Sequence, residues 1–193
     1  MMKTQIGVLA LQGDFAAHMR ALVRLGVRAV EVRSAPRLEN LRGLIIPGGE
    51  STTILKFLED ERMVEPLRRW VESGGAVYGT CAGTILMAKQ VTNPPQPALG
   101  LMDIDVVRNA YGRQVDSFIS STSEHELGGD PLELVFIRAP KISRLGRDVE
   151  VLARLGADPV LVRQGNRLSS TFHPELTDDV RVHQLLVQMA GEV

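Results

Sequence analysis

Apolar runs of strand length alternate with amphipathic helical stripes through the first half of this chain. Residues 6–11 form a continuous apolar run, and Phe15, Met19, Leu22 and Val23 then fall on one face of a helix. Further strand-like runs lie at 27–32, 44–46 and 76–78, and a second helical stripe consists of Met63, Leu67, Trp70 and Val71. Strands and helices that alternate in this way form βα units and a largely parallel sheet. The pattern therefore predicts an α/β fold.

The second half of the chain is strand-rich, with little helical periodicity. A proline-rich segment at 93–97 must be a loop, because proline cannot continue a helix. Predicted strands after it lie at 104–108, 118–121, 132–137, 149–152, 160–162 and 168–172. A closing helix has Val182, Leu185, Leu186 and Met189 on one face. A length of 193 residues suits one well-buried core, so we expect residues 1–193 to form a single domain.

The composition excludes several classes of protein. With 22 Lys and Arg against 23 Asp and Glu, and no basic cluster interleaved with aromatic residues, we expect no nucleic-acid partner. No apolar stretch reaches the length of a membrane span, and the apolar N-terminal run lacks a signal-peptide cleavage site, so we expect no membrane partner. A single cysteine cannot form an internal disulfide, which fits a reducing compartment and predicts a cytoplasmic protein.

That single cysteine, Cys81, lies in a Gly-Thr-Cys-Ala-Gly turn between the run at 76–78 and a helix predicted over 84–89. Such a strand-to-helix turn exposes its central residue, as the nucleophile elbow of hydrolases does. It also places the sulfur at a helix N-terminus, where the helix dipole favours thiolate over thiol. A lone cysteine is more often a small buried hydrophobe, however, so the turn alone leaves both interpretations open.

Two other segments follow predicted strands, and the carboxyl ends of neighbouring strands meet at one edge of an α/β sheet. Gly48 and Gly49 follow the run at 44–46. Glycine there lets a backbone N–H point into a site and hold an oxyanion, although a diglycine also commonly precedes a capped helix. Pro174 favours an extended His173, which brings Glu175 to the same side. This pair is typical of a general base with its orienting carboxylate, although His173 could instead be structural.

The other three histidines lack that setting. His18 falls on the first helix, which we expect at the surface, His125 lies between two glutamates, and His183 belongs to the closing helix. No pair among these residues has metal-ligand spacing with a third ligand nearby. We therefore expect no metal site.

Taken together, these segments resemble the class I, or triad, glutamine amidotransferases, whose triad runs Cys, His, Glu in chain order. Further motifs narrow the resemblance to the family of glutaminase subunits of pyridoxal 5'-phosphate synthase. The motifs are Leu11 to Gly13, Pro47 to Thr53, Gly79 to Gly83, Arg108 to Gln114, Phe136 to Pro140 and Phe172 to Thr177. They extend over essentially the whole chain. The resemblance implies a flavodoxin-like three-layer sandwich with a mostly parallel central sheet and a strand-rich second half.

By this resemblance, Cys81 is the nucleophile, His173 the general acid and base, and Glu175 its orienting carboxylate. Backbone N–H groups of Gly49 and Ala82 would form the oxyanion hole. The residues that would hold L-glutamine are Gly49, Glu50, Ser51, Arg108, Ile137 and Arg138, with Gln12 lining the site. Guanidinium groups suit the α-carboxylate of free glutamine, because they can bind it bidentately.

The implied activity is hydrolysis of L-glutamine to L-glutamate and ammonia through a cysteine thioester, without a cofactor. Ammonia is largely protonated at neutral pH, so such a glutaminase would pass it directly to a synthase subunit in a hetero-oligomer that makes pyridoxal 5'-phosphate (vitamin B6). Two alternatives stay open: another cysteine hydrolase of the same fold, and a catalytically silent regulatory subunit. Thr84 and the loop at 93–97 depart from the family's usual pattern, which bears only on packing behind the elbow and on one loop.

Overall fold

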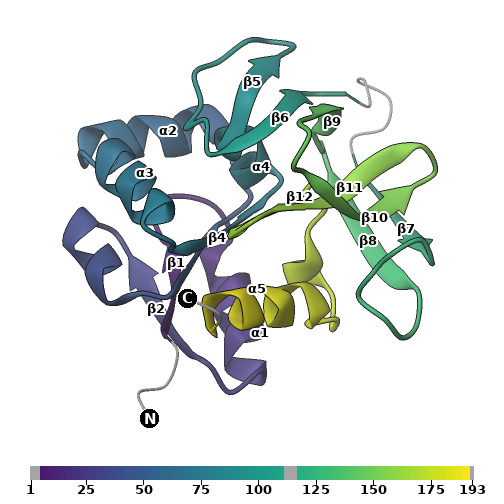
Figure 1. Cartoon of the computed structure of the whole chain (residues 1–193), viewed down its shortest axis with the longest axis horizontal. Helices are drawn as coiled ribbons and strands as arrows, with labels where there is room; N and C mark the ends of the chain where they lie inside the picture. Colours follow the sequence, from purple (N-terminus) through teal and green to yellow (C-terminus); the bar gives the residue numbers. More distant parts are fainter. Residues whose placement is uncertain (1–4, 111–116, 192–193) are drawn as a thin grey trace.

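A mainly parallel sheet of seven strands forms the centre of the computed structural model, which describes residues 5–110 and 117–191. Its strands are β1 (Gln5–Leu9), β2 (Arg28–Val32), β3 (Gly43–Ile46), β4 (Ala76–Thr80), β10 (Glu150–Leu155), β11 (Asp158–Gln164) and β12 (Arg167–Ser170). They lie in the order β10-β11-β12-β4-β3-β1-β2, and the last five of this order pair in parallel (Figure 1). Strands β10 and β11 add an antiparallel edge. This topology confirms the α/β prediction.

Helices cover both faces of the sheet (Figure 1). The helical segments are α1 (Phe15–Arg24), η1 (Ala35–Asn40), α2 (Ser51–Asp60), α3 (Val64–Glu72), α4 (Ala82–Met87), η2 (Pro174–Leu176) and α5 (Arg181–Gly191). Successive strand residues point to opposite faces, so they enter different cores. Ile45 packs in one core with Leu22 of α1 and Leu186 of α5, whereas Leu44 packs in the other with Leu58 of α2. The result is the three-layer sandwich that the family resemblance implies.

Two smaller sheets account for the strand-rich second half. One contains β5 (Ala88–Thr92), β6 (Met102–Val107) and β9 (Lys141–Leu145), and the other contains β7 (Ser117–Thr122) and β8 (Leu132–Ile137). Residues 111–114 of the predicted motif that begins at Arg108 lie outside the described residues. Within the described ranges, no helix combines the length and apolarity that a membrane crossing requires.

Two expectations about local structure are wrong, and one strand was not predicted. The helix predicted over 84–89 ends at Met87, because the chain from Ala88 onward pairs in parallel with β6, and this pairing overrides local helix propensity. The first strand ends at Leu9 instead of residue 11. The sequence pattern does not predict strand β9, since its sequence Lys-Ile-Ser-Arg-Leu is mostly polar; pairing with β6 makes it a strand.

Candidate active site

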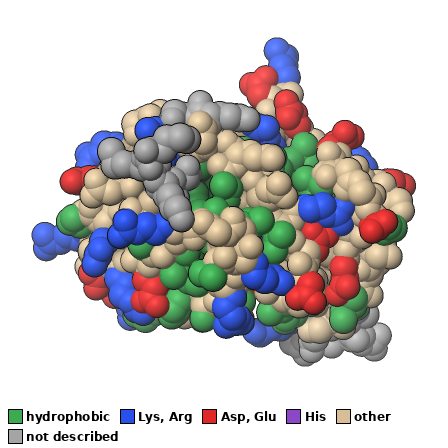
Figure 2. All heavy atoms as spheres, turned by 90° about the horizontal axis from the view of Figure 1, so that it is seen from below, with side chains coloured by type: hydrophobic (Ala, Val, Ile, Leu, Met, Phe, Trp, Pro, Cys, Tyr) green, Lys and Arg blue, Asp and Glu red, His purple; other side chains and the backbone are tan. Residues whose placement is uncertain are grey.

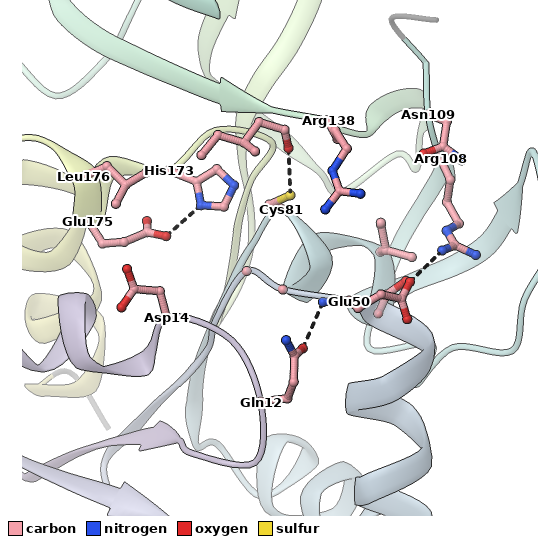
Figure 3. A pocket seen from close by; sticks show the side chains of 15 residues that line it. Gln12, Asp14, Glu50, Cys81, Arg108, Asn109, Arg138, His173, Glu175 and Leu176 are labelled. Carbon is pink, nitrogen blue, oxygen red and sulfur yellow. Dashed lines mark hydrogen bonds and ion pairs between the residues drawn. The ribbon is translucent and has the colours of Figure 1, made fainter. Parts of the chain in front are cut away.

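A cavity of about 460 Å³ opens at the carboxyl ends of β3, β4 and β12, which are neighbours in the sheet (Figure 3). Cavities of this size suit small-molecule ligands. The predicted site residues that line it are Gly49, Glu50, Ser51, Cys81, Arg108, Ile137, Arg138, His173 and Glu175, and Gln12 lines it too. The adjacency of the three strands therefore brings together segments that lie far apart in the sequence.

Cys81 occupies a strained turn between β4 and α4. Its φ of 49° and ψ of −100° are unusual for a residue with a Cβ. Glycine is required on both sides of it: a Cβ on Gly79 would lie 2.7 Å from the carbonyl of Gly83, and a Cβ on Gly83 would collide with the carbonyl oxygen of Ile46. The turn thus has the geometry of a nucleophile elbow, and the cysteine remains 7% exposed, at the cavity wall.

His173 and Glu175 form a buried pair beside the cysteine. Nδ1 of His173 lies 2.7 Å from Oε1 of Glu175, and the two residues are 8% and 7% exposed. Nε2 of His173 has no hydrogen-bond partner among the described residues, and Figure 3 shows this side of the ring turned toward Cys81. The imidazole therefore lies between a carboxylate on one side and the sulfur on the other.

The electrostatics of this trio favour charged forms. Burial would lower the pKa of His173, but the interactions of the ring with Cys81 and with Glu175 outweigh burial and raise the pKa to about 10. Burial would also raise the pKa of Glu175, but the neighbouring rings of His18 and His173 lower it below its ordinary value. These shifts favour the protonated ring of His173 and the ionised carboxylate of Glu175.

The loop after β3 approaches the imidazole closely. A Cβ on Gly48 would lie 2.5 Å from Cε1 of His173. Gly49 has a φ of 156°, which L-residues rarely adopt, and a Cβ there would lie 2.5 Å from Oε1 of Gln12. That same Oε1 accepts a hydrogen bond from the N–H of Glu50 at 2.9 Å. A side chain at Gly48 would press on the imidazole and one at Gly49 on the glutamine, so the loop passes closely between the two.

The two residues predicted to form the oxyanion hole border the cysteine from different segments. Gly49 lines the cavity, and Ala82 is the first residue of α4, directly after Cys81. That their N–H groups bind an oxyanion stays a prediction.

An ion pair lies at the other end of the cavity. Nη2 of Arg108 is 3.0 Å from Oε1 of Glu50. Burial would raise the pKa of Glu50, but hydrogen bonds from Thr52 and Thr53, together with the charge of Arg108, lower it, so this carboxylate is ionised. Arg138 has a φ of 44°, and Figure 3 shows its guanidinium beside Cys81. The cavity therefore presents positive and negative groups a short distance from the sulfur.

Ser51 and Ile137 complete the set of predicted substrate-binding residues. The carbonyl oxygen of Ile137, at the end of β8, lies 3.9 Å from Sγ of Cys81. The hydroxyl of Ser51 donates a hydrogen bond of 2.8 Å to Oε1 of Gln96 in the proline-rich loop. Thr84, which departs from the family's usual pattern, is buried and donates to the carbonyl of Ser170 at 2.6 Å, so its hydroxyl is satisfied behind the elbow.

Comparison with known proteins identifies the family. The SNO glutamine amidotransferase family matches residues 8–192. The chain belongs to this family. Among its relatives, the protein named pyridoxal 5'-phosphate synthase subunit PdxT of a Thermus thermophilus strain is 54% identical over 192 residues, which cover 98% of this chain and 100% of that protein. The PdxT subunit of Koribacter versatilis is 55% identical over 185 residues, or 96% of this chain and 95% of the relative.

Solved structures agree with the family assignment. One described as a crystal structure of glutamine amidotransferase is 53% identical, has a TM-score of 0.91 and covers 96% of this chain and 98% of its own. The structure of PurLQS from Thermotoga maritima is 17% identical with a TM-score of 0.67, covers 97% of this chain and 99% of its own, and shares the fold alone. The family resemblance and the flavodoxin-like fold of the class I amidotransferases are thus confirmed.

His18 lies on the helix expected at the surface, but its side chain points into the interior. The structure buries His18 completely, with Nε2 3.5 Å from Oε1 of Glu175, and no histidine is visible in Figure 2, which views the molecule from below. Position 18 lies three residues after Phe15 and four before Leu22, so it shares their inward face. The helical periodicity thus indicates an inward-facing His18, although the sequence alone assigned it no role.

The cavity is also lined by four residues that the sequence did not assign to it: Asp14, Ile85, Asn109 and Leu176. Asn109 and Leu176 lie within the family motifs, and Asp14 follows the Leu11 to Gly13 motif, where it accepts a hydrogen bond from the N–H of Ala17 as the cap of α1. Within residues 5–110 and 117–191, no group of three or more His, Cys, Asp or Glu side chains is arranged to hold a metal ion.

Proposed function

We propose that this chain is the glutaminase subunit of a pyridoxal 5'-phosphate synthase. It hydrolyses the side-chain amide of L-glutamine and supplies the ammonia to a synthase subunit for vitamin B6 biosynthesis. The observation that carries the proposal is a strained Cys81 that shares one cavity with the hydrogen-bonded His173–Glu175 pair. Membership of the SNO amidotransferase family and the names of the PdxT relatives support the substrate and the biosynthetic role.

In the proposed mechanism Cys81 gives its proton to His173, and the raised pKa of this ring, about 10, favours its protonated form. Cys81 attacks the carboxamide carbon as a thiolate, and the carbonyl π electrons move to oxygen. The resulting oxyanion is met by the N–H groups of Gly49 and Ala82. His173 then protonates the amide nitrogen, the C–N bond breaks, ammonia leaves, and a γ-glutamyl thioester remains on the sulfur.

Water completes the turnover. The now neutral imidazole of His173 takes a proton from a water molecule as its oxygen attacks the thioester carbon. The second tetrahedral intermediate expels the sulfur as a thiolate and releases L-glutamate. The γ-carboxylic acid of the product loses its proton to solvent, and the proton that His173 took from water makes this ring the imidazolium, which Glu175 keeps oriented through the 2.7 Å contact to Nδ1.

The charged groups at the far end of the cavity suit a free amino acid. In the proposal, Arg138 and Arg108 bind the α-carboxylate of glutamine, and Glu50 faces its α-ammonium group. These groups favour free glutamine over peptide-linked glutamine, the substrate of the alternative cysteine hydrolase, because a peptide bond removes both substrate charges. An intact thiol, imidazole and carboxylate in one cavity also disfavour a catalytically silent subunit.

The proposal includes a hetero-oligomer with the synthase subunit, because ammonia released into water at neutral pH is protonated and loses its nucleophilicity. It also includes a cytoplasmic location, since the single cysteine must stay reduced to act as a thiolate. The reaction as written uses no cofactor.

The test is glutamate release from L-glutamine by Cys81→Ala in the presence of the synthase subunit. We expect turnover to vanish while the variant keeps its fold, and Ser143→Ala on the distant strand β9 serves as the matched control with normal turnover. A parallel assay with glutamine inside a tripeptide should give no comparable hydrolysis. Ordinary turnover by Cys81→Ala, or equal cleavage of free and peptide-linked glutamine, would refute the proposal.

A further inference from the structure

Two buried histidines lie behind the His173–Glu175 pair and have no part in the mechanism above. His18 comes from α1 and His183 from α5, and both are 0% exposed. Nε2 of His18 lies 3.2 Å from Oγ1 of Thr80 and 3.5 Å from Oε1 of Glu175. Nδ1 of His18 lies 2.9 Å from Nε2 of His183. The two rings thus connect helix α5 with the carboxylate of Glu175.

The hydrogen-bond partners of the two histidines determine which ring nitrogen of each carries the proton. Nδ1 of His183 is buried without a hydrogen-bond partner among the described residues. A buried donor without a partner is costly, so this nitrogen carries a lone pair, and the proton of a neutral His183 is on Nε2. That N–H donates to Nδ1 of His18, which must then be the acceptor. The proton of His18 is therefore on Nε2, the nitrogen that faces Glu175.

The opposite assignment places two unfavourable contacts in the interior. If His18 donated from Nδ1, His183 would have to carry its proton on the unpartnered Nδ1. A neutral His18 of this kind would also direct a lone pair at the carboxylate oxygen of Glu175, 3.5 Å away. A protonated His18 requires the same unpartnered N–H on His183 and adds a buried charge.

We propose that His18, backed by His183, is a positioning residue that donates its Nε2–H to the Glu175 carboxylate and thereby fixes the group that orients His173. Oε2 of Glu175 is buried without a hydrogen-bond partner among the described residues, so N–H groups directed at Oε1 must stabilise the charge of this carboxylate. Oε1 lies 2.7 Å from Nδ1 of His173 and 3.5 Å from Nε2 of His18, whose hydrogen bond in this structure is to Thr80 at 3.2 Å. In the proposal the Nε2–H of His18 is shared between Thr80 and the carboxylate. This proposal rests on the proposed function, in which Glu175 serves the reaction.

The surroundings keep both rings neutral. The titratable and polar groups that face His18 from the elements packed around it are Asp14, Tyr78, Thr80, His173, Glu175 and His183. Burial is the largest influence on both rings: it lowers the pKa of His18 below its ordinary value and lowers that of His183 to about 3. Tyr78 is also neutral, since burial raises its pKa well above its ordinary value, and its hydroxyl bonds Oγ of Ser170 at 2.8 Å.

The first test needs no substitution. In the intact protein at neutral pH, the ¹⁵N side-chain spectrum should show His18 and His183 as neutral Nε2–H tautomers with unprotonated Nδ1. Two single variants, His18→Gln and His183→Gln, assign the signals. A neutral Nδ1–H tautomer or an imidazolium at position 18 would overturn the proposal, whether or not the protein is an active glutaminase.

The second test measures how the rate of Cys81 alkylation by iodoacetamide depends on pH, and in particular the acid limb, the pH range in which the rate falls as the solution becomes more acidic. The modified cysteine is unambiguous, because the chain has one cysteine. In His18→Leu the carboxylate loses a donor, so the pKa of Glu175 rises and the acid limb should move up by about one pH unit. Glutamine turnover should fall by about tenfold to a hundredfold. His18→Gln restores an amide N–H donor and should return the limb toward its original position.

Leu22→Ala on the same helix is the control for a purely structural effect. It removes buried apolar volume next to α5 and should lower stability without moving the acid limb. The proposal fails if His18→Leu leaves the limb in place, or if the Leu and Gln variants shift it equally. Failure of the proposed function is a separate outcome, because it appears as absent glutamine turnover in the parent protein while the tautomers and the alkylation profile are still measurable.

Discussion

Replacing Gly48 by alanine should impair catalysis far more than folding. The new Cβ would lie 2.5 Å from Cε1 and 3.1 Å from Nδ1 of His173, whereas ordinary contacts begin at 3.4 Å, so the ring must move by about 0.9 Å, the difference between 3.4 and 2.5 Å. That ring makes the 2.7 Å contact to Glu175. A misplacement of about 1 Å can cost about a hundredfold in rate, and we expect a loss of that size in kcat.

Folding should be little affected, because Gly48 does not belong to the glycines with positive φ and its backbone accommodates alanine. The assay is steady-state glutamine hydrolysis with the synthase subunit present, together with urea unfolding of the isolated chain. Gly191→Ala is the control, since a Cβ there meets no atom within 4 Å. Turnover by Gly48→Ala within twofold of the parent would refute the argument, as would a kcat loss fully explained by an unfolded fraction.

Three other predictions rest on particular contacts. The pKa of buried His183 is lowered from 6.5 to about 3, so only the unfolded chain takes up this proton as the pH falls from 6.5 to 4.5. This residue should therefore cost about 2 kcal/mol of unfolding free energy over that range, and a flat profile of the urea midpoint would contradict the prediction. Gly83→Ala drives a Cβ into the carbonyl of Ile46 and should destabilise the protein by about 2 kcal/mol or more in urea unfolding, unlike Gly191→Ala. Arg108→Lys loses the planar fork and should raise the KM for glutamine by about tenfold, with Arg144→Lys in the β6–β9 sheet as a control; an unchanged KM would remove Arg108 from substrate binding.

The fold was largely predictable because its central strands are buried on both faces. Strands such as β3, with four buried residues, have sequences that are apolar throughout, and the helices between them show one apolar stripe. Strand β9 has no such signature, since its only fully buried residue is Ile142 and it forms through pairing with β6. Edge elements of this kind depend on a neighbour that local sequence does not reveal.

The site was predictable to the extent that its chemistry is local. A few neighbouring residues indicate the tight turn at Cys81 and the close placement of His173 and Glu175. The two segments then lie at one site because their strands are neighbours in the sheet. His18 differs, because its role depends on His183, 165 positions later in the sequence. Helical periodicity places His18 on the inward stripe of α1. A polar group buried there requires a hydrogen-bond partner, and that partner is decided by the packing of α1 beside α5. A polar residue on an apolar helix face therefore predicts a buried hydrogen-bond partner elsewhere in the chain. Here the partner of His18 is His183, and His18 also lies beside Glu175, the carboxylate proposed to orient His173.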